Sequence, residues 1–187
     1  MKIVITGGPG GGKTTALDLF KRELHGKAWI IPESASAIFE SGIRRDNRFE
    51  ILKAIQKTIF YYQKNVEEIY ESQHPGELLL CDRGTLDGLA YWPDTQESFF
   101  KCMNSTFELE LSRYDAVIHF ETAAAKGQDI TTNNPFRNES NEAAVELDHK
   151  LKEIWKAHPN FHLVESKGSF IDKIIHGVET IRKVLHE

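Results

Sequence analysis

A glycine-rich run near the start of the chain has the residue types and the spacing that hold phosphate groups. Its sequence, Gly7-Gly8-Pro9-Gly10-Gly11-Gly12-Lys13-Thr14, fits the pattern G-x-x-x-x-G-K-[ST]. Glycines let the backbone curl with its N–H groups turned inward around phosphate oxygens, and a following helix adds its positive N-terminal end. The lysine brings a mobile charge to the β and γ phosphates, and the threonine hydroxyl suits Mg²⁺.

This pattern predicts a site for the triphosphate of ATP with Mg²⁺. ATP is favoured over GTP because the chain contains no Asn-Lys-x-Asp sequence. Lys13 is expected to act in catalysis and Thr14 to bind the metal. A glycine-rich turn without a ligand is the weaker alternative, since an apolar run precedes the motif and a helical pattern follows it. The predicted nucleotide-binding residues are Gly7, Gly8, Pro9, Gly10, Gly11, Gly12, Lys13, Thr14 and Thr15.

A second candidate is the carboxylate of Asp82, which follows the apolar run of residues 78–81. If that run is a strand next to the first one, Asp82 lies beside the phosphate loop, where it can hold the shell of a metal ion. The sequence therefore predicts Asp82 as a catalytic and Mg²⁺-binding residue. The alternative is an aspartate that caps a helix beginning near Thr85.

The elements that must position these residues alternate along the chain. Short β-prone runs lie between helical patterns, and three consecutive leucines at 78–80 indicate a strand that is buried on both faces, as in a parallel sheet. The predicted fold is an α/β three-layer sandwich, a five-stranded parallel sheet with helices on both faces. The expected strands are residues 2–6, 28–32, 77–81, 116–121 and 161–165, and the expected helices are 13–25, 34–41, 48–73, 96–113, 140–157 and 170–186.

Two of these segments carry further expectations. Residues 48–73 place Ile51, Ile55, Ile59, Tyr62, Val66 and Ile69 at steps of three and four, which predicts an apolar stripe facing the core. Gln56, Phe60 and Gln63 lie off that stripe, on a face suited to reading a base. The irregular stretch that begins at Thr122 predicts a lid over residues 122–142, because long loops in compact domains are usually functional or disordered.

Length and composition limit the function classes. The 187 residues predict one domain, 1–187, with 40% apolar and 27% charged residues to form a core and a solvated surface. A formal charge of −5 argues against nucleic acid as a partner. No apolar run is long enough to span a membrane, and two widely separated cysteines fit a reducing cytoplasm. The oligomeric state stays open, with a homodimer as one option.

Together these motifs resemble the nucleoside and nucleotide kinase branch of P-loop proteins. The chain also resembles small bacterial P-loop ATPase/kinase proteins grouped with the nicotinamide riboside kinase domain. The resemblance covers most of the chain and rests on Ile5-Thr6-Gly7-Gly8-Pro9-Gly10, on Pro32-Glu33, on Asp82-Arg83-Gly84 with Asp87 and Tyr91, and on Arg137-Asn138-Glu139.

The resemblance implies roles for two further residues. In similar deoxynucleoside kinases a glutamate after the second strand accepts the proton of the acceptor hydroxyl, and Glu33 occupies that position. Its alternative is a glutamate that favours the dipole of the following helix. Lid arginines of such kinases stabilise the transferred phosphoryl group, which points to Arg137; pairing of Arg137 with Glu139 or Glu142 is the alternative.

The same resemblance places an acceptor site near the segment between the second and third helices. Arg44 and Arg45 lie there and can hold a phosphate or carboxylate, although a solvated turn carries such charges as often. Gln63, Arg83 and Tyr91 complete the predicted acceptor set, with a core position as the alternative for Tyr91.

Two function classes follow. The first is an ATP-dependent phosphotransferase acting on a small, nucleoside-like acceptor. The second is a P-loop ATPase or nucleotide-dependent switch acting on a protein partner.

Overall fold

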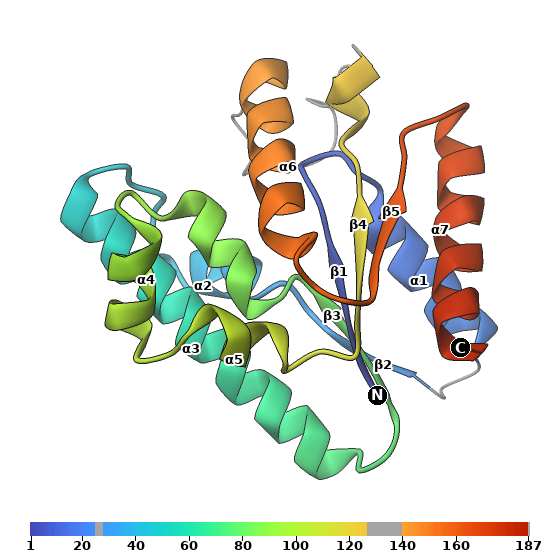
Figure 1. Ribbon diagram of the computed structural model, residues 1–187, viewed down its shortest axis with the longest axis horizontal. Coiled ribbons are helices and arrows are strands. Elements are labelled where there is room, and N and C mark those ends of the chain that lie inside the picture. Colours follow the sequence, from blue (N-terminus) through green and yellow to red (C-terminus); the bar gives the residue numbers. More distant parts are fainter. Residues whose placement is uncertain (25–27, 127–139, 187) are drawn as a thin grey trace.

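The computed structural model describes residues 1–24, 28–126 and 140–186 as a sheet covered by helices on both faces (Figure 1). Within the described residues the strands form one parallel sheet in the order β2-β3-β1-β4-β5, which confirms the predicted α/β class. The strands are β1 (Lys2–Thr6), β2 (Ala28–Ile31), β3 (Leu78–Asp82), β4 (Ala116–Phe120) and β5 (Phe161–Val164).

The connections between the strands are mostly helical. They are α1 (Lys13–Glu23), α2 (Ser34–Glu40), α3 (Phe49–Gln73), the 3-10 helix η1 (Thr85–Tyr91), α4 (Gln96–Met103), α5 (Phe107–Leu111), the 3-10 helix η2 (Ala123–Lys126), α6 (Asn141–Trp155) and α7 (Phe170–His186). None of these described helices has the length and apolarity needed to cross a membrane.

Alternate residues of the central strand β1 pack into two separate hydrophobic cores, one on each face of the sheet. Ile3 and Ile5 pack with α1 and α7 on one face of the sheet. Val4 packs on the other face with Leu79, Val117 and Trp155, against which α3 and α6 lie. Because side chains alternate along a strand, a strand buried on both faces must be largely apolar, as residues 3–5 of β1 and 78–81 of β3 are.

The segment expected as one helix over residues 96–113 is two helices. Asn104 ends α4 in the left-handed conformation, with φ of 48°. Thr106 then starts α5, because its hydroxyl accepts a hydrogen bond from the Leu109 amide at 3.2 Å. The prediction of a continuous helix was wrong because it relied on the spacing of apolar residues. It missed residues 104–106, Asn-Ser-Thr, which favour the end of one helix and the start of the next.

The apolar stripe predicted for α3 does not face the core as a whole. Tyr62 and Ile69 are 40% and 51% exposed, whereas the neighbouring Gln56, Gln63 and Glu67 are buried. The helix therefore turns a polar face inward. Ile55 is buried and Val66 packs against the core, but the prediction was wrong for Tyr62 and Ile69, because periodicity alone assumes that the buried side is the apolar one.

Candidate active site

The phosphate loop lies between β1 and α1, and glycine is required where the loop turns. Gly7 has φ of 128°, and a Cβ there would lie 2.0 Å from the backbone oxygen of Phe120. Gly12 has φ of 86° and starts α1 from the left-handed conformation. Lys13 is buried, and its Nζ donates hydrogen bonds of 2.8 Å to the backbone oxygens of both Gly7 and Gly8. The sequence motif thus forms a closed loop at the N-terminus of a helix.

Asp82 reaches this loop because β3 pairs directly with β1, with Ile5 opposite Asp82. The Thr14 hydroxyl lies 3.4 Å from the Asp82 carboxylate. Burial raises the pKa of Asp82, while the charge of Lys13 acts in the opposite direction. One hydroxyl and one carboxylate fit Mg²⁺, which takes few protein oxygens and keeps waters and phosphate oxygens as its other ligands.

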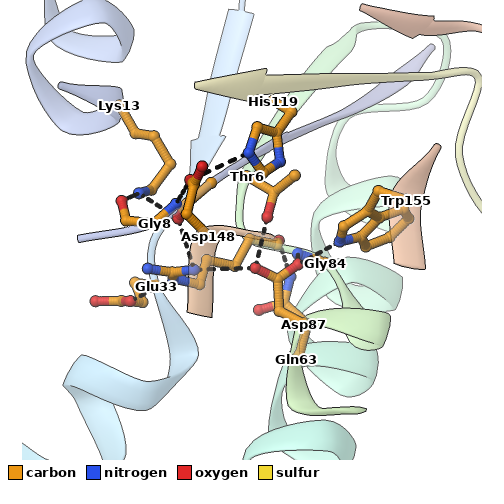
Figure 2. Close-up of polar contacts among 12 residues, drawn as sticks. Thr6, Gly8, Lys13, Glu33, Gln63, Gly84, Asp87, His119, Asp148 and Trp155 are labelled. Carbon is orange, nitrogen blue, oxygen red and sulfur yellow. Dashed lines mark hydrogen bonds and ion pairs between the residues drawn. The ribbon is translucent and has the colours of Figure 1, made fainter. Parts of the chain in front are cut away.

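The alternative in which Asp82 caps the next helix is wrong, because that cap is made by another aspartate. Asp87 accepts a hydrogen bond from the Gly84 amide at 3.1 Å at the start of η1. The same carboxylate accepts from the Thr6 hydroxyl at 2.7 Å, from Arg83 at 3.1 Å and from the Trp155 indole at 2.9 Å. Asp87 therefore joins β1, η1 and α6 at the site (Figure 2).

Arg83 links the phosphate loop to the end of β2. Its backbone has φ of 76°, a conformation that a non-glycine residue rarely adopts and that costs on the order of 1 kcal/mol. The guanidinium donates to the Glu33 carboxylate at 2.7 Å through Nε and to the Gly7 carbonyl at 3.2 Å through a terminal nitrogen. Such strain is typical of positions that the surrounding contacts hold in place for function.

Glu33 precedes α2, and its charge is fixed by its partners. Burial alone would raise the pKa of Glu33, but the Arg83 guanidinium and the hydrogen bond from the Ser36 hydroxyl at 2.6 Å outweigh it and lower the pKa to about 2. The carboxylate is therefore ionised at neutral pH. It lies at the N-terminus of α2, as the alternative interpretation requires, and at the same time faces the pocket described next.

A pocket opens between α2, α3 and η1, beside the Glu33–Arg83 ion pair. Its walls bring together four residues of the predicted acceptor set, Arg45, Gln63, Arg83 and Tyr91. Arg44 is exposed and does not line it. The remaining lining residues are Glu33, Ser34, Ala35, Phe39, Gln56, Ile59, Phe60, Gly84, Thr85, Asp87 and Gly88.

Sequence reasoning missed a second carboxylate that contacts the phosphate loop. Asp148 in α6 accepts a hydrogen bond from the Gly8 amide at 2.6 Å, and its Oδ1 lies 3.1 Å from His119 Nε2 (Figure 2). It also accepts from the Thr122 amide at 3.2 Å. Burial would raise the pKa of Asp148, but His119 and the Gly8 amide lower it. No sequence signal marks a lone aspartate within an amphipathic helix as the partner of a loop 140 residues away.

The structure describes only part of the predicted lid, residues 122–142. Arg137 and the rest of residues 127–139 lie outside the described residues. Of the described part, the Thr122 hydroxyl donates to the Pro9 carbonyl at 2.5 Å, and the Ser140 hydroxyl caps α6 by accepting from the Ala143 amide at 3.3 Å.

Comparisons with known proteins bear on this site. A family model described as an AAA domain matches residues 2–173. The sequence has no significant match among curated proteins.

Three solved structures resemble the chain over all or nearly all of its length. Deoxyadenosine kinase from M. mycoides with bound dATP is 17% identical, with a TM-score of 0.59 and all of both chains covered. Thymidylate kinase from Ehrlichia chaffeensis is 21% identical, with a TM-score of 0.60 over 99% of this chain and 98% of that one. NadR protein in complex with NAD and AMP-PNP is 15% identical, with a TM-score of 0.66; all of this chain covers 49% of that chain. The fold is therefore that of the P-loop nucleoside and nucleotide kinases.

Proposed function

The chain belongs to the AAA domain family and has the fold of P-loop nucleoside and nucleotide kinases, and from this premise we propose that it is an ATP-dependent phosphotransferase acting on a small, nucleoside-like acceptor. The observation that carries the proposal is the position of Arg83. One guanidinium contacts both the phosphate loop, at the Gly7 carbonyl, and Glu33 in the wall of the adjoining pocket. This contact supports adjacent sites for a phosphate donor and a small acceptor.

The donor is assigned to the loop of residues 7–15. In the proposed complex its amides surround the phosphate oxygens of ATP, and Lys13 turns from the Gly7 and Gly8 carbonyls to the β and γ phosphates. Thr14 and Asp82 would hold Mg²⁺, which would neutralise part of the phosphate charge when it is bound. This chain supplies alignment and positive charge, which phosphoryl transfer chiefly needs.

The acceptor is assigned to the pocket beside Glu33. The hydroxyl oxygen of the acceptor forms a new bond to the γ phosphorus. The bond between that phosphorus and the oxygen that joins it to the β phosphate breaks, and ADP leaves. Glu33, already ionised, orients the hydroxyl and accepts its proton as the phosphoryl group moves. Arg83 keeps Glu33 in place, Arg45 is assigned to an anionic or polar group of the acceptor, and Arg137 is proposed to stabilise the transferred phosphoryl group.

Two similar structures support this chemistry, because one is a deoxyadenosine kinase and the other a thymidylate kinase. For this chain, a nucleoside-like acceptor also fits the mixture of aromatic, amide and charged groups that line the pocket.

A P-loop ATPase or nucleotide-dependent switch acting on a protein partner is the second candidate. The observation in its favour is the low pKa of Glu33, about 2. A carboxylate with so low a pKa is a weak general base, so it contributes little to removing the proton from an acceptor hydroxyl. In that case ATP would be hydrolysed slowly, a partner protein would stimulate the reaction, and no small molecule would gain phosphate.

One experiment separates the two. The purified protein is incubated with Mg²⁺, ATP labelled at the γ phosphate, and a panel of nucleosides, nucleotides and ribosides, and products are separated from ATP and inorganic phosphate. Label in an acceptor, lost in a Glu33→Ala variant that still binds ATP, supports the phosphotransferase. Label that appears only in inorganic phosphate across the whole panel contradicts it and favours the ATPase.

A further inference from the structure

Asp87 is a buried carboxylate to which the proposed transfer step gives no role. It lines the acceptor pocket but is only 4% exposed. Its Oδ2 accepts from the Gly84 amide and the Trp155 indole, and its Oδ1 accepts from the Thr6 hydroxyl (Figure 2). Oδ1 also accepts from Arg83. A carboxylate has about four positions for donors, so these bonds leave Asp87 none for a ligand.

Arg83 connects this carboxylate to the proposed chemistry. Its Nη1 donates to Asp87 at 3.1 Å and to the Gly7 carbonyl at 3.2 Å, and its Nε donates to the Glu33 carboxylate at 2.7 Å. Acceptors on different sides of a planar guanidinium fix both its place and its plane. A displacement of Asp87 would therefore turn the guanidinium and move the Glu33 carboxylate with it.

Trp155 holds Asp87 from α6. The side chain of Trp155 is fully buried, and its Nε1 donates to the Asp87 carboxylate at 2.9 Å. A Cβ on Gly84 would lie 2.8 Å from the indole ring, so the glycine next to Arg83 leaves the space that the ring needs. The Tyr114 ring packs edge-on against the indole, with centroids 5.6 Å apart. The direction of the indole N–H is thus set by packing on two sides.

We propose that Asp87 and Trp155 are positioning residues for phosphoryl transfer, which hold Glu33 at the acceptor hydroxyl by way of Arg83. This inference rests on the proposed phosphotransferase function. Trp155 lies behind Asp87, and the Asp87 carboxylate is fully occupied, so both act through Arg83. Proton transfer and attack need a closely defined geometry, whereas the binding of ATP does not depend on Glu33. The effect is therefore expected in kcat and not in the KM for ATP.

The test uses Trp155→Phe, which removes the indole N–H and keeps a buried aromatic ring. The assay contains Mg²⁺, ATP labelled at the γ phosphate, and the compound that the wild type phosphorylates fastest in the panel of nucleosides, nucleotides and ribosides. We expect kcat to fall by about 10-fold and the KM for ATP to stay within about twofold of the wild type. Trp29→Phe is the matched control and should keep the wild-type kcat, because its indole donates to Glu77, which does not line the pocket.

A second measurement separates positioning from a purely structural role. In a Glu33→Gln background the base is already absent, so Trp155→Phe should lower the remaining kcat by less than about twofold. A purely structural role would lower kcat by the same factor in both backgrounds. If Trp155→Phe does not fold by circular dichroism, Thr6→Val removes another donor to Asp87 and takes its place in both measurements.

Two results would overturn the inference: an unchanged kcat in the folded variant, or an equal loss of kcat in both backgrounds. The proposed function fails in a different way, when the wild type itself phosphorylates no compound of the panel.

Discussion

Glu33 illustrates how one ion pair fixes the charge of a group in the pocket. Burial disfavours its charged form, yet the Arg83 guanidinium at 2.7 Å reverses the effect and lowers the pKa to about 2 from an ordinary 4.5. Because the folded pKa is the lower one, the pair stabilises the fold fully above pH 4.5, and that contribution is lost as the pH falls from about 4.5 to 2.

In a Glu33→Gln variant, the free energy of unfolding should no longer contain the pH-dependent contribution of the Glu33–Arg83 ion pair. At pH 7 we expect its free energy of unfolding to be lower than that of the wild type by on the order of 1–3 kcal/mol, since the pair is partly exposed, and the gap should close as the pH falls below 4.5. This difference in the free energy of unfolding is measured by denaturant unfolding from pH 7 down to the lowest pH at which both proteins fold. Glu40→Gln, on the exposed side of α2, is the control, and a gap that does not change with pH would contradict the expectation.

Lys13 belongs to the proposed nucleotide site, and its substitution should separate stability from function. In the structure its Nζ donates to two carbonyls of the phosphate loop, and we expect Lys13→Ala to melt within a few degrees of the wild type. Phosphate transfer should fall by on the order of 10³-fold or more, because the developing charge loses its cation. Lys21→Ala, exposed on the same helix, should transfer phosphate normally. Normal turnover by Lys13→Ala would remove the loop from the mechanism.

Helix α3 marks the limit of prediction from sequence periodicity. The spacing of its apolar residues correctly indicated a helix, predicted over residues 48–73, and the structure places it at Phe49–Gln73. The side that faces inward could not be predicted, because the partners of Gln63 and Glu67 come from distant places: Lys2 in β1, Arg83 between β3 and η1, and Arg113 after α5. A polar residue is buried at no net cost only when distant parts of the chain satisfy it, which a local pattern does not record.

Glu67 is the residue on which this polar face depends. Its carboxylate accepts from Lys2 at 3.0 Å, from Arg113 at 2.8 Å and from the Tyr114 hydroxyl at 2.8 Å. Glu67→Ala removes the buried carboxylate that Lys2 and Arg113 share and leaves them their pairs with Glu71 and Glu110. It should lower the free energy of unfolding by about 3–5 kcal/mol. The adjacent Glu68→Ala, which is exposed, should change it by less than about 0.5 kcal/mol. Equal effects in denaturant titrations would show that burial of the carboxylate contributes little.

The break between α4 and α5 can be tested at Asn104. Because its φ of 48° suits glycine and asparagine, Asn104→Gly should leave stability within about 0.5 kcal/mol of the wild type, whereas Asn104→Ala should cost about 1 kcal/mol. Thermal unfolding of the two variants measures the difference. A helix that ran through this position in solution would reverse the order, since alanine would then be the better residue.

At the scale of the whole molecule, the sequence predicted what local signals encode and missed what the packing of distant segments creates. The phosphate loop, the parallel sheet and the place of Asp82 followed from a motif and from apolar runs at strand positions. The contact between Asp148 and the Gly8 amide did not, because it joins segments 140 residues apart and depends on how α6 lies across the sheet. The grouping of Arg45 and Tyr91 around one pocket was expected only from a resemblance.

Asp148 connects α6, which follows the predicted lid, to the phosphate loop. Asp148→Ala removes the acceptor for the Gly8 and Thr122 amides, so we expect a loss of about 2–4 kcal/mol in stability and weaker binding of ATP with Mg²⁺ by roughly tenfold. Asp148→Asn keeps an accepting oxygen and should lie much closer to the wild type. Calorimetric titration with ATP and denaturant unfolding measure the two effects, and identical behaviour of both variants would argue against a role for this oxygen.

The order of strands in the sheet also has a consequence during synthesis on the ribosome. β1 lies at the centre, but its two neighbours, β3 and β4, are translated only after roughly 80 and 120 residues of the chain. At about 5–20 residues per second, this apolar strand waits for several seconds before both of its hydrogen-bonding edges can be covered. A nascent chain arrested before Ala116 should therefore be open to protease and to chaperones at β1, and one extended past β4 should be protected there.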